Sequence, residues 1–507
     1  PQLSSLEPKS SASTSSATPA SSIMSGRDAA GGGCITWAQG LAAKKWPFPP
    51  CQTARRLLDI SVRKWSAFSM TKRVFPLTRR RLLAGLGATV LGPVMPSVAT
   101  AQGRKALMLQ AKPGAAALRP GQPDTPIWSL LTSEAGMRFR RGDLLEVVLE
   151  NGLPAPVVLN WRGIDGAPAA EPLTARSPLA PGAKDTFVLP LRHAGAFLCD
   201  LRLLGDGQAR PLPARALIVE ESENIGVDRD EVILIEDLRL RPDGTAIAPG
   251  TAPKDTTPLF TVNGRTTMDI LTRANERLRF RFINACQRKV IAVKIEDHDV
   301  RVMAIDSQPS EPFLARNSQL VLAPGTRVDT FVNAVRPPGS TSSVLLHDGT
   351  EPRPIARLVY SSDAPIRDAP LPVPAALPSN GLPARLDLKN ALRIDLTLGG
   401  PQSDWVPPAT FAPANAPAFR AKPGRTVVLA LTNRAEIPTV FHLHGHHFRL
   451  LDRLDDGWKP FWLDTLAIEA GQTQRIAFAA EYVGRWLIES MATEWAAPRL
   501  VRWYSVE

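Results

Sequence analysis

Between residues 103 and 507 the chain alternates short apolar runs with turns rich in proline and glycine. A typical run is Asp143–Glu150 (DLLEVVLE), in which Val and Leu are interleaved with charged residues. Short runs of this kind, bounded by turn residues, are typical of strands that are buried on one face. No long stretch with helical periodicity interrupts the series, so the pattern predicts an all-β protein.

The predicted strands fall into three groups, and turns recur every ten residues or so, which is typical of β-sandwiches. The first group, within 102–225, comprises 143–150, 157–161, 185–190, 195–204 and 216–220. The second, within 226–362, comprises 232–236, 278–284, 290–295, 302–305, 320–322 and 330–332. The third, within 385–507, includes 484–488 and 500–506. A chain of 507 residues suits three domains of about 150 residues each.

Residues 363–384 separate the second group from the third. They contain the prolines Pro365, Pro370, Pro372, Pro374, Pro378 and Pro383. Segments so rich in proline are extended and semi-rigid. We therefore expect a stiff linker here.

The net charge of +12 is concentrated near the N-terminus. Residues 1–101 contain 13 Lys+Arg and 3 Asp+Glu, which leaves 47 and 45 for the rest of the chain. The body is thus almost neutral, so no nucleic-acid partner is expected.

The basic segment reads as an export signal over residues 70–101. Arg79-Arg80 precedes a weakly apolar run, and Ala99-Thr100-Ala101 supplies the small residues of a cleavage site. Paired arginines indicate the twin-arginine route and therefore a bacterial periplasmic location. Glycines and prolines interrupt the apolar run, so it does not predict a membrane anchor, and no transmembrane segment is expected in the mature chain.

Residues 1–69 do not begin with Met and are rich in Ser and Ala, so we interpret them as a non-native or disordered extension before Met70. The mature chain would retain Cys199 and Cys286, and the sequence leaves open whether they form a disulfide.

The stretch Phe441–Phe448 holds four of the seven histidines. In an extended strand alternate residues share a face, which predicts that His442, His444 and His446 point the same way. Imidazoles at this spacing suit copper or zinc, but further ligands are needed from elsewhere.

Several motifs resemble those of the multicopper oxidase family. They are Asn160-Trp161-Arg162-Gly163, the segment 322–329 (LAPGTRVD), the segment 437–446 (IPTVFHLHGH) and Gly484-Arg485-Trp486. The resemblance spans about residues 103–507. It implies three cupredoxin-like Greek-key β-sandwich domains.

The same resemblance implies where the copper ligands of the family fall in this chain. The four His-x-His pairs of its three-copper centre fall on Asn160 and Arg162, Asp200 and Arg202, His442 and His444, and Glu489 and Met491. The ligands of its mononuclear blue site fall on Thr439, Ser490, Trp495 and Leu500. Only His442 and His444 keep the ligand type, so the other positions are expected to be degenerate.

Arg162 and Arg202 bring positive charge, and Asp200 and Glu489 bring negative charge. Buried charges persist only when they are paired, so we expect a salt-bridged cluster around His442 and His444. The alternative is that these substitutions are scattered and make no contact.

Three interpretations of the histidine strand stay open. The histidines are retained for hydrogen bonding, or they hold one copper or zinc ion with the help of His446 or His447, or the strand is polar by coincidence. The isolated His193, His298 and His347 are expected to be surface or loop residues. Asp306 and Asp464 are expected to cap turns.

These features resemble the copper-free, division-associated members of the family, which bind or stabilise partners. We therefore expect a non-enzymatic periplasmic protein with a protein partner and no cofactor. The alternative is a copper-binding oxidoreductase or metal carrier with fewer copper ions than the family norm.

Overall fold

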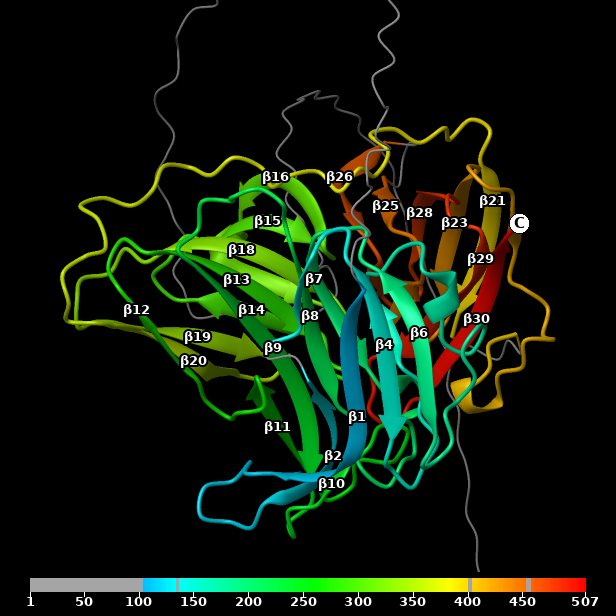
Figure 1. The fold of residues 1–507 in the computed structure, drawn as a ribbon, viewed down its shortest axis with the longest axis horizontal. Coiled ribbons are helices and arrows are strands. Elements are labelled where there is room, and N and C mark those ends of the chain that lie inside the picture. The colour runs from blue at the N-terminus through cyan, green and yellow to red at the C-terminus, as the bar shows by residue number, and fades with distance from the viewer. Residues whose placement is uncertain (1–103, 134–135, 400–403, 453–456) are drawn as a thin grey trace, which may run out of the picture. The chain divides into compact units, whose positions relative to one another are not determined.

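The structure, a computed structural model, describes residues 104–133, 136–399, 404–452 and 457–507 (Figure 1). The predicted extension 1–69, the signal peptide 70–101 and its cleavage site lie outside these ranges. Within them the secondary structure consists of strands and four short 3₁₀ turns, which confirms the all-β prediction. No helix in the described part is long and apolar enough to span a bilayer.

Two four-stranded sheets come from residues 105–220. The first has the order β2-β1-β4-β6 and consists of β1 (Lys105–Ala116), β2 (Thr125–Thr132), β4 (Leu144–Asn151) and β6 (Lys184–Pro190). The second has the order β3-β8-β7-β5 and consists of β3 (Arg138–Arg140), β5 (Asn160–Arg162), β7 (Gly195–Asp200) and β8 (Ala214–Glu220). In Figure 1 the blue and cyan strands β1, β4 and β6 lie side by side.

Residues 229–360 form two further sheets. The larger contains β9 (Arg229–Leu240), β10 (Ala246–Ile247), β11 (Thr257–Val262), β13 (Arg277–Asn284), β15 (Arg301–Ile305), β16 (Gln308–Leu314) and β18 (Arg327–Asn333). The smaller has the order β12-β20-β19-β14-β17, with β12 (Asp269–Thr272), β14 (Ile291–Ile295), β17 (Gln319–Leu322), β19 (Thr341–His347) and β20 (Pro352–Tyr360).

The last two sheets come from residues 392–506. One has the order β21-β23-β28-β25-β26, with β21 (Leu392–Leu398), β23 (Thr426–Asn433), β25 (Phe448–Leu451), β26 (Trp458–Leu463) and β28 (Thr473–Ala479). The other has the order β22-β30-β29-β24-β27, with β22 (Arg420–Ala421), β24 (Thr439–Leu443), β27 (Thr465–Ile468), β29 (Gly484–Ala492) and β30 (Arg499–Val506). The red strands β29 and β30 are neighbours in Figure 1.

The four 3₁₀ turns redirect the chain near the sheet ends. They are η1 (Pro168–Ala170), η2 (Arg202–Leu204), η3 (Arg316–Ser318) and η4 (Pro408–Thr410). The run predicted as one strand over 195–204 therefore splits, because β7 ends at Asp200 and η2 begins at Arg202. The strand predicted over 157–161 starts later than expected, at Asn160.

Residues 361–391 contain no helix or strand. This segment is docked on the rest of the chain by Asn380, which is buried and hydrogen-bonds to both backbone polar atoms of Ala194. Cys199 and Cys286 are both free and buried, so they do not form the disulfide that the sequence left open.

Candidate functional site

The residues at the predicted three-copper positions are brought together by strand pairing. His442 on β24 lies opposite Glu489 on β29, and Asn160 on β5 lies opposite Asp200 on β7. These strands belong to sheets from the first and last parts of the chain. Hydrogen bonds from Asn160 and Arg162 to Glu489 connect these two sheets.

Glu489 is the centre of a buried ion-pair cluster and is only 2% exposed. Its Oε2 lies 2.8 Å from Arg162 Nη2 and 2.9 Å from Arg499 Nη1. Its Oε1 accepts a hydrogen bond of 3.2 Å from Asn160 Nδ2. Burial alone would raise the pKa of this carboxyl, but the two guanidinium groups and His444 hold the pKa well below its usual range.

His444 lies between two carboxylates. Its Nε2 is 2.9 Å from Glu489 Oε1, and its Nδ1 forms an ion pair of 2.9 Å with Glu171 Oε1. Burial opposes the charged form, but Glu171 and Glu489 outweigh it and raise the pKa of His444 to about 9. At neutral pH His444 is therefore protonated, and a metal at either nitrogen would have to displace a proton.

His442, in contrast to His444, is neutral. Its Nδ1 lies 3.1 Å from the Asp464 carbonyl oxygen and 3.0 Å from Thr465 Oγ1, so Nδ1 carries the proton. Burial, helped by the charge of Arg162, lowers the pKa of His442 to about 4. Its Nε2 therefore bears a lone pair, and that atom has no hydrogen-bond partner.

The expected ion pairing holds for Arg162 and Glu489 but is wrong for Arg202. Arg162 Nε also lies 3.7 Å from Asp200 Oδ2, at the edge of ion-pair range. The guanidinium of Arg202 instead pairs with Glu236, because η2 turns it away from the cluster. Only the backbone N–H of Arg202 contacts Asp200, at 2.9 Å.

Arg499 and Glu171 complete the cluster, and neither was expected from the sequence. Arg499 begins the strand that pairs with β29, so its position beside predicted ligand positions was a usable signal. Glu171 follows η1 and carries no sequence signal. Three cations (Arg162, Arg499 and His444) face three carboxylates (Glu171, Asp200 and Glu489).

His446 does not share a face with His442 and His444, which corrects the prediction. The strand β24 ends at Leu443, and Gly445 adopts a left-handed φ of 73° that redirects the chain. His446 Nδ1 donates to the Tyr504 hydroxyl at 2.7 Å, and its Nε2 accepts the Tyr482 N–H at 3.1 Å. Burial lowers the pKa of His446 to about 4, and both of its nitrogens are satisfied without a metal.

The predicted blue-site positions hold no thiol and make ordinary contacts. Thr439 Oγ1 donates to Asn433 Oδ1, and Trp495 Nε1 donates to the Ala248 carbonyl oxygen. Ser490 is buried and pairs across strands with the half-buried Leu500. Met491 Sδ lies 3.2 Å from Arg288 Nη1.

Asp306 and Asp464 do more than cap turns, contrary to expectation. Both are buried, and Arg327 Nη2 lies 2.5 Å from Asp464 Oδ2. Burial and the neighbouring Asp464 charge raise the pKa of Asp306 to about 7.

Two of the isolated histidines, expected to be surface or loop residues, lie in loops but are buried. His193 is 6% exposed and His298 is 4% exposed. His193 contacts Asp165, which in turn contacts His447.

Comparisons with known proteins identify the fold as that of multicopper oxidases. A family model described as multicopper oxidase matches residues 385–507, and a second of the same description matches residues 229–345. No curated protein sequence matches the chain.

Solved structures of similar fold include a multicopper oxidase from Pseudomonas thermotolerans, 24% identical, with a TM-score of 0.68 over 80% of this chain and 100% of that one. A laccase-like multicopper oxidase from Ochrobactrum sp. is 19% identical, with a TM-score of 0.62 over 79% of this chain and 97% of that one. A multicopper oxidase from Campylobacter jejuni, described as a metallo-oxidase, is 15% identical, with a TM-score of 0.61 over 79% and 91%. The two family models include the motif-bearing segments 322–329, 437–446 and 484–486, and the solved structures share the fold, so this chain belongs to the multicopper oxidase family.

Proposed function

We propose that this chain is a periplasmic, non-enzymatic member of its family that binds or stabilises a protein partner. The observation that supports this most is the Arg162–Glu489 ion pair of 2.8 Å at positions where the family resemblance puts copper ligands. A guanidinium and a carboxylate that neutralise each other in a buried site leave neither charge available for a metal.

Three copper ions do not fit the side chains present. Metal ligands must offer a lone pair, whereas the guanidinium groups of Arg162 and Arg499 stay protonated in proteins and have none to offer. Positive charge in a buried space also repels copper ions. The cluster is already balanced by its own carboxylates, so it needs no metal to compensate charge.

A blue copper ion does not fit either, because such a site requires a thiolate. Ser490 occupies the cysteine position. In the described chain the free thiols are Cys199 and Cys286, and burial raises the pKa of each well above its usual value.

One observation favours the second candidate function, a metal carrier with a reduced copper complement. His442 Nε2 is an unpartnered lone pair, and ligand atoms of His442, His444 and Glu489 lie within 4.8 Å of one another. A copper ion there would have to deprotonate His444 and break its contacts with both glutamates. The free-energy cost of losing these contacts favours the non-enzymatic, partner-binding function over the metal carrier.

Metal analysis and oxygen consumption test the proposal. The full chain, expressed with copper in the medium and purified from the periplasm, is expected to contain no stoichiometric copper and to show no copper-dependent dioxygen uptake with phenols or cuprous ion. Ser490→Cys should not create a blue absorption band, since Thr439 and Trp495 supply no imidazole. Copper at one ion per chain that is lost in His442→Ala would favour the carrier instead.

The location is tested separately. Replacing Arg79 and Arg80 together by Lys is expected to leave the protein in the cytoplasm, because the twin-arginine route requires the arginine pair. Fractionation and immunoblotting measure this. Unchanged export would exclude the twin-arginine route.

A further inference from the structure

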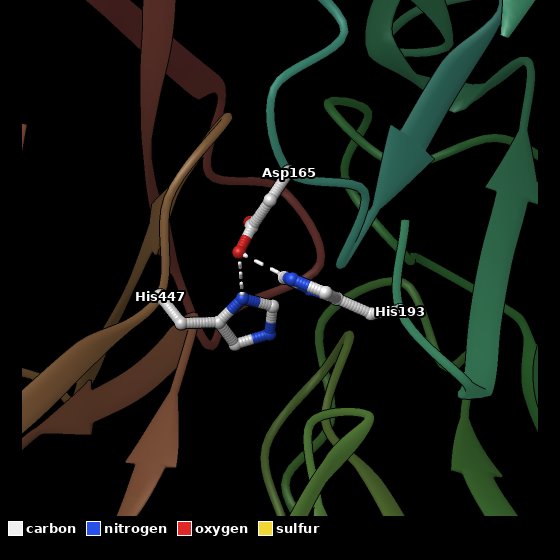
Figure 2. Close-up of side chains that lie close together, drawn as sticks. All are labelled: Asp165, His193 and His447. Carbon is white, nitrogen blue, oxygen red and sulfur yellow. Dashed lines mark hydrogen bonds and ion pairs between the residues drawn. The ribbon is translucent and has the colours of Figure 1, made fainter. Parts of the chain in front are cut away.

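A second group of metal-ligating side chains lies apart from the predicted copper positions. It consists of Asp165, His193 and His447, which come from three loops and converge on one point (Figure 2). The three residues are 4%, 6% and 3% exposed. Asp165 follows β5, His193 lies between β6 and β7, and His447 lies between β24 and β25.

The spacing of the donor atoms suits one small cation. Asp165 Oδ2 lies 2.7 Å from His447 Nδ1 and 3.5 Å from His193 Nδ1. Ligand atoms of the three residues all lie within 4.8 Å of one another. In a tetrahedral zinc site with bonds of about 2.0 to 2.1 Å, the ligand atoms are roughly 3.3 Å apart. Small side-chain shifts would therefore bring these atoms to zinc-binding distance.

The ring of His447 is held in an orientation that directs Nδ1 at Asp165. Its Nε2 lies 2.7 Å from the Asp306 carbonyl oxygen, which can only accept, so Nε2 carries a proton. Ligating histidines commonly donate their second N–H to a backbone carbonyl in this way. Burial opposes the charged form, but the Asp165 carboxylate outweighs it and raises the pKa of His447 to about 9. A metal at Nδ1 would therefore displace the proton that His447 now donates to Asp165 and keep the carboxylate neutralised.

The tautomer of His193 follows from a chain of amide contacts. Asn380 Oδ1 accepts the Ala194 N–H, so its Nδ2 faces Gln308 Oε1, at 3.2 Å. Gln308 Nε2 is then the atom that donates to His193 Nδ1, at 3.1 Å. His193 Nδ1 is therefore unprotonated, and burial lowers the pKa of this residue to about 4. The lone pair of His193 Nδ1, which now accepts from Gln308, thus lies 3.5 Å from the Asp165 oxygen that His447 contacts, so a single cation could meet all three groups.

We propose that Asp165, His193 and His447 form a zinc site that is separate from the His442–Glu489 cluster. Two imidazoles and one carboxylate are a common zinc ligand set when a water molecule completes the tetrahedron. A void of about 10 Å³ adjoins Asp165 and His447 and has room for about one water molecule. Zinc would take over the contact that Gln308 makes with His193. It would tie the loop after β5 to the loop after β24, at a point where Gly166 already donates to the Gly445 carbonyl oxygen.

The test is zinc binding by the full chain after removal of metals with a chelator. Calorimetric titration with Zn²⁺ at neutral pH is expected to give one ion per chain. His193→Ala is expected to weaken this binding by about a hundredfold or more, since losing even an outer hydrogen bond of a metal site costs ten- to a hundredfold. His442→Ala serves as the matched control, because it removes a buried neutral histidine from the other cluster and should leave zinc binding unchanged.

Thermal unfolding of each variant without metal checks that it folds. If His193→Ala does not fold, the absorption spectrum of the Co²⁺-loaded protein is the test. Intense visible bands of tetrahedral cobalt in both the wild type and His442→Ala would support the site. Their absence would overturn it. The proposal is also overturned when the wild type binds no zinc, or when His193→Ala binds as the wild type does. Loss of binding in His442→Ala alone would assign the metal to the His442–Glu489 cluster.

Discussion

Glu489 shows how one buried charge is stabilised by several residues at once. Four residues contact its carboxylate: Arg162, Arg499, Asn160 and His444. A carboxylate removed from water is stable only when such contacts replace its hydration. A glutamate at position 489 therefore depends on the identity of these neighbours.

We predict strong coupling between Arg162 and Glu489. Arg162→Ala and Glu489→Ala should each lower the free energy of unfolding by roughly 3–5 kcal/mol, because each leaves an unpaired buried charge. The double variant should recover part of that loss. Denaturant titration of the four proteins measures this.

The exposed pair Lys184–Glu150, at 3.0 Å, is the matched control and should cost only a small fraction as much. Additive and small effects at Arg162 and Glu489 would contradict the buried ion-pair interpretation.

The shifted pKa values of the buried histidines predict how the free energy of unfolding depends on pH. The pKa of His444 is about 9 in the folded protein, above its unfolded value of 6.5, so its stabilising contribution is complete below about pH 6.5 and is lost as the pH rises through 9. Urea titrations across this range should show falling stability. His447, whose pKa the Asp165 carboxylate likewise raises to about 9, adds to the same decline, so His444→Gln should reduce the decline without abolishing it.

His298→Gln is the control, because burial lowers the pKa of His298 and it should not affect the alkaline limb. On the acid side, His193, His442 and His446 have pKa values of about 4 and should destabilise the fold as the pH falls from 6.5 toward 4. An unchanged alkaline decline in His444→Gln would show that His444 is neutral.

At the scale of elements, the end of β24 decides which histidines meet. The strand stops at Leu443, and the left-handed Gly445 then sends His446 and His447 toward other partners. A Cβ at Gly445 would lie 2.2 Å from Trp486 Cε3. Glycine is therefore required here both by φ and by the close approach of the indole ring.

Gly445→Ala should lower the free energy of unfolding by roughly 3 kcal/mol or more, because left-handed strain and overpacking add. Gly471→Ala is a matched control, since Gly471 has a φ of 70° and a Cβ added to it would meet no atom within 4 Å. The free energy of unfolding of Gly471→Ala should fall only by the cost of a left-handed backbone, roughly 1–2 kcal/mol. Equal losses in the two variants would mean that Trp486 moves aside without cost.

At the scale of the whole molecule, Arg327 joins sheets from all three parts of the chain. It lies on β18, pairs with Asp464 between β26 and β27, and donates from Nε to the Ala196 carbonyl oxygen of β7 at 3.2 Å. It is fully buried. These contacts make it a common anchor of the three pairs of sheets.

Arg327→Met should destabilise the protein by roughly 3–5 kcal/mol, because it leaves the buried carboxylate of Asp464 unpaired. It should also speed proteolysis within residues 361–391, which connect the second and third pairs of sheets. Arg336→Met, which breaks a more exposed pair with Asp297, is the control. Wild-type cleavage rates in Arg327→Met would show that the sheets associate without this anchor.

Local patterns were enough to predict much of this protein. Alternating apolar positions and regular turns predicted the all-β class and most strand locations, because the period of a strand is set by its own backbone. The family resemblance, and not a local pattern, placed Arg162 and Glu489 at neighbouring copper positions. The rule that a buried charge needs a partner then predicted ion pairing there, without deciding which arginine pairs with which carboxylate.

Only the tertiary structure decided which further side chains meet at the site. Arg202 was expected in the cluster, but a 3₁₀ turn points it at Glu236, whereas Glu171 and Arg499 reach His444 and Glu489 from a turn and a neighbouring strand. Asp165, His193 and His447 are far apart in sequence and meet only because three loops converge. Where a strand ends and which loops come together depend on packing between sheets, and no local pattern of residues encodes that.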